Sequence, residues 1–151
     1  MTPLIRPAQK ADAAMAVQVL RRSISELCHE DHHDDPKEIA SWLENKTVET
    51  WRHWVEHPNA TVFVAEEGGG VRGVGMVRSD GKILLNYVSP EARFCGISKA
   101  ILTILEQEAS AGGAAFTTLE STRTARRFYL ANGYSSEGGL DPLQMKKALP
   151  A

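Results

Sequence analysis

Hydrophobic residues recur along the chain with two different periods, and the change between them divides the predicted structure. From 11 to 27 they return every three or four residues, which predicts an amphipathic helix. Asp35-Pro36 is a typical helix start, and Ile39, Trp42 and Leu43 form the apolar face of the helix that it predicts. Thr47 opens another short helix, which should end near 57–59. We therefore expect a helical N-terminal third, preceded by a short strand that ends near Pro7.

Beyond residue 60 the hydrophobic pattern becomes that of strands. β-Branched and apolar runs occupy 61–65, 71–77 and 83–88, and glycine-rich or Asp-Gly turns separate them. The pair Asp80-Gly81 is a good hairpin signal, and the triplet 68–70 gives a looser connection. These runs predict an antiparallel meander of three strands.

The C-terminal half alternates helices with strands. The pattern predicts a helix over 96–111, a strand over 115–120, a helix over 122–131 and a last strand over 143–149. Because a helix joins the strand at 83–88 to the one at 115–120, these two should be parallel. The order of elements predicts one α+β domain over residues 1–151 with a mixed sheet.

Composition excludes several classes of function. The 151 residues are 42% hydrophobic and 24% charged, with a formal net charge of −2, so strong binding to nucleic acid is not expected. Two cysteines are too few for a disulfide framework, which favours a reducing cytoplasm. The sequence has neither an export signal nor a run of 18 apolar residues, so we expect no membrane anchoring.

The segment 87–100 has the composition of an anion site. A strand ends there, a short loop follows, and a helix begins at Gly96, where a ligand can come close to the backbone. Unpaired N–H groups in the first helical turn favour a phosphate, and Arg93 and Lys99 add positive charge. Close packing between a strand and a helix would explain the same glycine, so spacing alone leaves both interpretations open.

A second motif strengthens the first. Arg93-x-x-Gly96-x-Ser98, preceded by Tyr87-Val88-x-Pro90 and followed by the segment 125–134, resembles the GNAT superfamily of GCN5-related N-acetyltransferases. The family's loop reads Gln/Arg-x-x-Gly-x-Gly/Ala, so Ser98 is a departure, although it is small enough for a phosphate to approach the backbone. The resemblance covers the order of elements from 4 to 149. It implies a mixed, mainly antiparallel sheet flanked by helices on both faces.

The resemblance also implies acetyl-CoA as co-substrate and assigns residues to it. The amide of Val88 would polarise the thioester carbonyl. Thr122 would contact the pantetheine arm, although a plain helix N-cap is an equal alternative. The loop that would hold the pyrophosphate consists of Arg93, Phe94, Cys95, Gly96, Ile97, Ser98 and Lys99.

Tyr129 matches the tyrosine that commonly donates a proton to the departing thiolate in this family. A phenol with a pKa of about 10 is a reasonable donor to a thiolate of cysteine-like pKa, about 8.5. Packing on an amphipathic helix is the alternative role for this residue. The general base is left open among Glu26, Glu30, Asp31, Glu120 and a water held by Asn86.

The bend at 28–35 is rich in histidine and acidic residues. His29 with His32 or His33 has spacing that could present two imidazoles to one ion, but no third protected ligand is evident, so we expect no metal. Residues 26–38 hold six acidic side chains against one lysine, a formal charge of −5 that would attract a cationic amine.

Together these features predict an acyl-CoA-dependent N-acetyltransferase that acts on a primary amine, either a small cationic amine or a peptide amine, by direct attack in a ternary complex. A non-catalytic acyl-CoA-binding or regulatory domain on the same fold is the first alternative. A metal sensor built on the histidines of the bend is the second. Exposed sheet edges leave room for a homodimer, which nothing in the sequence establishes.

Overall fold

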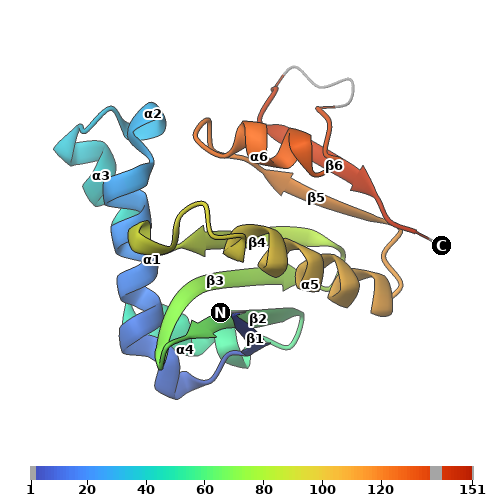
Figure 1. Ribbon diagram of the computed structural model, residues 1–151, viewed down its shortest axis with the longest axis horizontal. Coiled ribbons are helices and arrows are strands. Elements are labelled where there is room, and N and C mark those ends of the chain that lie inside the picture. The colour runs from blue at the N-terminus through green and yellow to red at the C-terminus, as the bar shows by residue number, and fades with distance from the viewer. Residues whose placement is uncertain (1–2, 137–140, 151) are drawn as a thin grey trace.

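The computed structural model describes residues 3–136 and 141–150, which form one six-stranded sheet with helices packed on it (Figure 1). None of the described helices is long and apolar enough to span a bilayer. The elements in chain order are β1 (Leu4–Pro7), η1 (Lys10–Asp12), α1 (Ala13–Leu27), α2 (His29–His32), α3 (Pro36–Leu43), α4 (Val48–Glu56), β2 (Ala60–Glu67), β3 (Gly70–Arg78), β4 (Lys82–Val88), η2 (Pro90–Ala92), α5 (Ile97–Ala111), β5 (Phe116–Glu120), α6 (Arg126–Ala131) and β6 (Gln144–Ala148).

The six strands lie side by side in the order β1 to β6. All neighbours are antiparallel except β4 and β5, which are parallel, so the predicted mixed sheet and its parallel pair are confirmed. The pairing of β4 with β5 is short, because only Lys82 and Ile83 have partners on β5. Beyond them the two strands move apart (Figure 1).

Alternation along the strands divides the core between the two faces of the sheet. On β2, Val62 and Val64 pack with residues of α1, whereas Phe63 and Ala65 pack with residues of α5. Trp51 of α4 is completely buried in the first of these clusters. Helices therefore cover both faces of the sheet, as the resemblance implied.

Two glycines on β3 bring α5 very close to the sheet. A Cβ at Gly73 would lie 2.7 Å from the Cδ1 atom of Ile101, and one at Gly75 would lie 2.4 Å from its Cγ2 atom. Any larger residue at these positions would push the helix outward. The sequence Gly-Val-Gly on β3 thus fixes how closely the first turns of α5 approach β4.

The observed helices depart from the predicted ones at two places. The bend at 28–35 contains a separate short helix, α2, because Cys28 interrupts α1. Helix α6 begins at Arg126 rather than at 122, because the hydroxyl of Thr122 accepts the N–H of Ala125 at 3.1 Å and closes a turn first. The starts at Asp35 and Thr47 are confirmed, since each side chain caps its helix.

A buried polar network fastens β5 and the C-terminal strand β6 to α5. The hydroxyl of Tyr134, a residue that is 2% exposed, lies 2.7 Å from the hydroxyl of Thr117 and donates to Glu106 at 2.8 Å. Lys147 of β6 donates to the other oxygen of Glu106 at 3.1 Å. Burial raises the pKa of Tyr134, so its hydroxyl remains a donor.

Tyr134→Phe should lower the free energy of unfolding by about 1–3 kcal/mol, because Glu106 and Thr117 each lose a partner in a buried place. Urea unfolding followed by circular dichroism measures this change. Thr103→Val, on the exposed side of α5, is the matched loss of a hydroxyl and should change little. Equal stability of the two variants would show that the network contributes nothing.

Candidate active site

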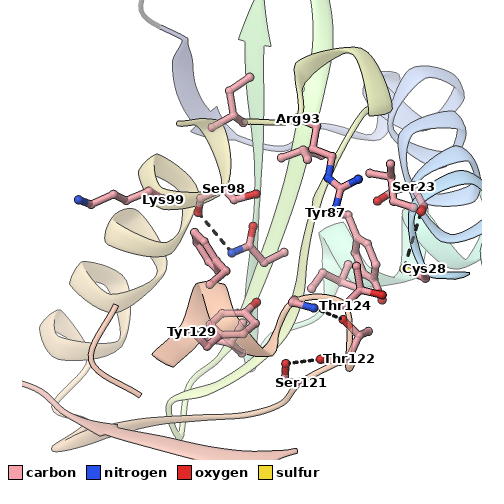
Figure 2. A pocket seen from close by; sticks show the side chains of 18 of the residues that line it. Ser23, Cys28, Tyr87, Arg93, Ser98, Lys99, Ser121, Thr122, Thr124 and Tyr129 are labelled. Atoms are coloured by element: carbon pink, nitrogen blue, oxygen red, sulfur yellow. Dashed lines mark hydrogen bonds between the residues drawn. The ribbon is translucent and has the colours of Figure 1, made fainter. Parts of the chain in front are cut away.

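The parting of β4 and β5 opens a cavity in the middle of the sheet. A β-bulge lies in β4 opposite Met76 and Val77, where Leu84 has no partner on β3. The main cavity, of about 440 Å³, fills the gap between the strands and continues to the start of α5 and the ends of α1 and β5. Figure 2 shows side chains of α1, β4, α5 and α6 around it.

Backbone N–H groups of β4 face this cavity. The amide of Ser89 donates to Arg72 of β3 at 2.8 Å, and the hydrogen bonds of an antiparallel pair alternate along a strand. The amides of Val88 and Asn86 therefore point away from β3, on the side where β5 has moved away. The amide of Val88, which the resemblance assigns to the thioester carbonyl, therefore faces the cavity.

The start of α5 forms the second wall. Gly96 precedes the helix with φ of +81°, and space is open around the position that a Cβ would take. Among the described residues, the first backbone hydrogen bond of the helix runs from the amide of Ala100 to the carbonyl of Gly96. The amides before it, those of Ile97, Ser98 and Lys99, are the unsatisfied donors of a helix start, and all three residues line the cavity.

The loop before the helix is only partly arranged as the sequence predicts. Arg93 and Phe94 line the cavity, and the guanidinium of Arg93 stacks on the ring of Phe94 at 4.6 Å. Phe94 is 90% exposed and has φ of +67°, a strained conformation for a non-glycine residue. Cys95 does not line the cavity, and its amide is used by the carbonyl of Ala92 at 3.3 Å.

Tyr129 of α6 lies at the bottom of the main cavity and is 6% exposed (Figure 2). Its ring makes edge-to-face contacts with Phe128 and Tyr134, with centroid distances of 5.1 and 5.6 Å. Burial raises the pKa of Tyr129 to about 12, although the side chain of Asn86 acts in the opposite direction. The phenol is thus protonated at neutral pH, and both predicted roles, packing and proton donation, remain compatible with its position.

Asn86 carries an unpaired buried atom in the lining of the cavity. Its amide nitrogen donates to the carbonyl of Ser98 on α5 at 3.3 Å, which fixes the orientation of the side chain because that carbonyl can only accept. The Oδ1 atom is then left buried without a partner among the described residues. A buried acceptor of this kind is costly unless a ligand or a water supplies a donor.

The far end of the cavity contains residues to which the sequence assigned no role in a site. Ser23 and Cys28 of α1 and its C-cap, with Tyr87 of β4, face the end opposite Lys99 (Figure 2). Burial raises the pKa of the Cys28 thiol to about 12, so it is not a nucleophile at neutral pH. The helical period of α1 marks Ser23 as inward-facing, but it gives no sign that a cavity lies there.

The candidate general bases lie in different parts of the structure. Glu26 is paired with Arg22 at 2.9 Å on the outer surface, and Asp31 accepts hydrogen bonds from the turn before α6. Glu30 lines a different, outer cavity. Among the described residues, Glu120 is the one carboxylate in the lining of the main cavity.

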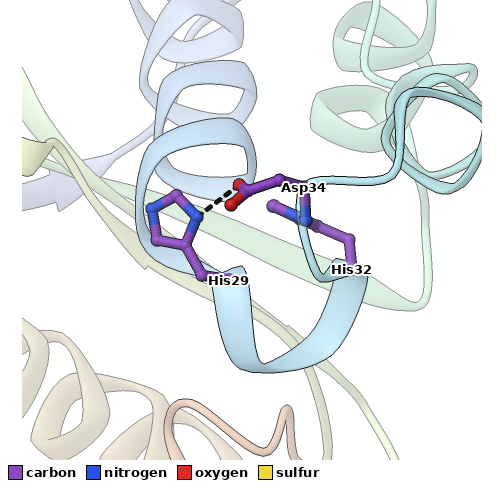
Figure 3. A group of neighbouring side chains, drawn as sticks. All are labelled: His29, His32 and Asp34. Carbon is purple, nitrogen blue, oxygen red and sulfur yellow. Dashed lines mark hydrogen bonds and ion pairs between the residues drawn. The ribbon is translucent and has the colours of Figure 1, made fainter.

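The histidine bend has an internal hydrogen-bond arrangement (Figure 3). Ring and carboxylate atoms of His29, His32 and Asp34 lie within 4.8 Å of one another. Both ring nitrogens of His32 are occupied, because Nε2 donates to the carbonyl of Ile24 at 2.8 Å and Nδ1 accepts the amide of Asp34 at 3.0 Å. His32 therefore has no lone pair left for a cation, and the group closes the end of α1.

Solved structures share this arrangement of strands and helices. A GCN5-related N-acetyltransferase (aminotransferase, class II) from Rhodopseudomonas palustris is 21% identical, with a TM-score of 0.87 over 99% of this chain and 97% of that one. PaiA N-acetyltransferase from Thermoplasma acidophilum, solved in complex with coenzyme A, is 20% identical, with a TM-score of 0.83 over 98% of this chain and 99% of that one. YncA from Salmonella typhimurium, solved with its cofactor acetyl-CoA, is 19% identical, with a TM-score of 0.67 over 100% and 96% of the two chains.

A search of curated proteins gives no match. A family model described as "Acetyltransferase (GNAT) domain" matches residues 30–147, which is most of the chain. The matched segment includes the parted strands β4 and β5, the glycine at the start of α5 and the tyrosine of α6. The chain belongs to the GNAT family of acetyltransferases.

Proposed function

We propose that this protein transfers the acetyl group of acetyl-CoA to a primary amine by direct attack in a ternary complex. The observation that carries the proposal is a single cavity lined by three kinds of group. These are the free amides of a parted strand, the free amides of a helix start and a buried phenol. Such a set fits a long thioester ligand that carries a pyrophosphate group.

The start of α5 is the part of the cavity suited to the pyrophosphate. The amides of Ile97, Ser98 and Lys99 supply donors, the helix dipole supplies a positive end, and Arg93 and Lys99 add charge. The arm of the co-substrate would follow β4 and take the place of the missing β5 partner, accepting hydrogen bonds from the outward amides of β4. Thr122 lines the same channel, and its hydroxyl hydrogen is available to the arm.

The chemistry follows from the groups at the parted strands. The amide of Val88 would donate to the thioester oxygen and stabilise the negative charge that develops there. The amine nitrogen forms a bond to the acyl carbon, the carbon–sulfur bond breaks, and Tyr129 supplies a proton to the departing sulfur. The high pKa of Tyr129 keeps this proton in place across the neutral range.

Glu120 is our choice for the base that takes the proton from the attacking amine. It ends β5 at the rim of the main cavity, whereas the other candidate carboxylates are paired elsewhere or line another surface. The acidic bend itself contributes no carboxylate to the cavity lining. Attraction of a cationic acceptor would therefore rest on Glu120 at close range and on the bend only at a distance.

The first experiment is calorimetric titration of the protein with acetyl-CoA. Gly96→Val should weaken binding at least about tenfold, because the branched side chain occupies space that the phosphate needs. Gly113→Val is the matched control, since Gly113 has φ of +93° and equally open surroundings at the other end of α5. Equal affinity of the two variants would remove the phosphate site, and absence of binding to the unmodified protein would remove the proposed function.

Tyr129→Phe should lower turnover by about tenfold to a thousandfold and leave the affinity for acetyl-CoA nearly unchanged, because only the proton donor is lost. Release of coenzyme A in the presence of a panel of primary amines measures turnover. In the unmodified protein we expect no loss of turnover between pH 7 and pH 9 from this group, because its pKa is raised to about 12. Undiminished turnover of the variant would reduce Tyr129 to a packing residue.

Glu120→Gln should lower turnover at neutral pH by about a hundredfold, because the amide cannot accept a proton from the amine. Part of this loss should be recovered as the pH rises and more of the amine becomes neutral. Glu91→Gln, on the outer surface beside Arg22, is the control for loss of one negative charge. If the two variants showed equal rates and the same pH profile, Glu120 would not be the base.

A further inference from the structure

Asp31 joins two segments that are 92 residues apart in the sequence. One of its carboxylate oxygens accepts the amide of Arg123 at 2.7 Å, and the other accepts the amide and the hydroxyl of Thr124, at 3.2 and 2.7 Å. These contacts tie α2 to the turn between β5 and α6. We call them the Asp31 clasp.

The clasp stands between two cavities. Leu27, Cys28 and Thr124 line the main cavity on one side of it. On the other side, α2 and the same turn line the outer cavity of about 700 Å³, whose described lining is His29, Glu30, His33, Arg123, Arg126, Asp141, Pro142 and Leu143. Asp31 lines neither cavity, so its carboxylate belongs to the partition between them.

The clasp closes the end of the main cavity that remains for the acceptor. The phosphate-binding end is at the start of α5, marked by Lys99, and Cys28 and Thr124 lie on the opposite side (Figure 2). A ligand that enters from α5 and reaches Tyr129 leaves only this opposite end for a second substrate. An acceptor longer than this end must extend past the partition.

Helix α2 is attached at two places. His32, which is 1% exposed, ties it to α1 through the carbonyl of Ile24, and the clasp ties it to the turn before α6. The helix has four residues, and the residues after it, His33 and Asp34, have φ of +51° and +59°, which is unfavourable for non-glycine residues. A carboxylate with three donors is a strong attachment compared with a neutral hydrogen bond. Loss of its charge should therefore release α2 from the turn before α6.

We propose that Asp31 is a specificity-determining residue that keeps the partition closed and so limits the size of the amine that reaches the thioester. The inference rests on the proposed function, because it assigns the far end of the main cavity to the acceptor. Opening the clasp joins the two cavities. A bulky acceptor then gains room, whereas a small one gains nothing.

The test uses two bisubstrate analogues, in which the sulfur of coenzyme A is joined through an acetyl linker to butylamine or to the lysine side chain of a tetrapeptide. Affinities for both are measured by calorimetry, so turnover is not needed. Asp31→Asn is the test variant, since it removes the charge and turns an N–H group toward donors. Glu38→Gln is the matched control, because it removes the same charge from the acidic run 26–38 at an exposed position that lies outside the clasp and outside the lining of both cavities.

We expect the unmodified protein and Glu38→Gln to prefer the butylamine analogue by the same ratio. In Asp31→Asn this ratio should shift toward the peptide analogue by about tenfold, the size expected for one strong hydrogen-bonded contact. Thr124→Val removes only the hydroxyl donor and should give a smaller shift in the same direction. This second variant keeps the test valid if Asp31→Asn folds poorly.

Hydrogen exchange tests the clasp independently of its proposed role in specificity. The amides of Arg123 and Thr124 should exchange faster in Asp31→Asn but not in Glu38→Gln. Faster exchange with an unchanged affinity ratio would overturn the role in specificity, and unchanged exchange would overturn the clasp itself. If the unmodified protein bound neither analogue nor acetyl-CoA, the proposed function would fail, and the specificity role with it.

Discussion

The separation of β4 from β5 is the constraint on which the rest of the site depends. A parallel pair that continued past Ile83 would use the amides of Asn86 and Val88 in the sheet and leave no space for a ligand. The bulge at Leu84 changes which residues face each side, so that Ile83 and Val88, an odd number apart, both pack toward α5. Strands β4 and β5 are thus paired at Lys82 and Ile83 and separated beyond them.

Close packing on the α5 face gives this opening a fixed shape. Gly73 and Gly75 let Ile101 approach the sheet, and the start of α5 is thereby held beside the free end of β4. The amide of Asn86 then reaches Ser98 in the first turn of the helix. Donors from a strand and from a helix meet at one cavity because Gly73 and Gly75 of β3 lack side chains.

The sequence predicts the order and type of most elements because their signals are local. Apart from the short helix α2, period, capping residues and Asp-Gly turns locate the α-helices and strands from 4 to 120, and the glycine before α5 marks the predicted anion site. The late start of α6 was not predictable, because the turn that the Thr122 hydroxyl closes is also held by Asp31, which lies far away in the sequence. The far wall of the cavity was missed for a similar reason, since Ser23, Cys28 and Tyr87 look like ordinary core positions.

The acidic bend shows that a count of charged residues does not tell which carboxylates are free to bind a ligand. Asp35 caps α3, Asp34 pairs with His29 and Asp31 holds the turn before α6, so three carboxylates of the run serve the backbone and its neighbours. An unpaired group lies elsewhere, in the lining of the main cavity, where Asn86 Oδ1 is buried without a partner among the described residues. Since buried polar groups are almost always satisfied in proteins, its position beside the outward amides of β4 is better evidence for a ligand than any count of charged residues.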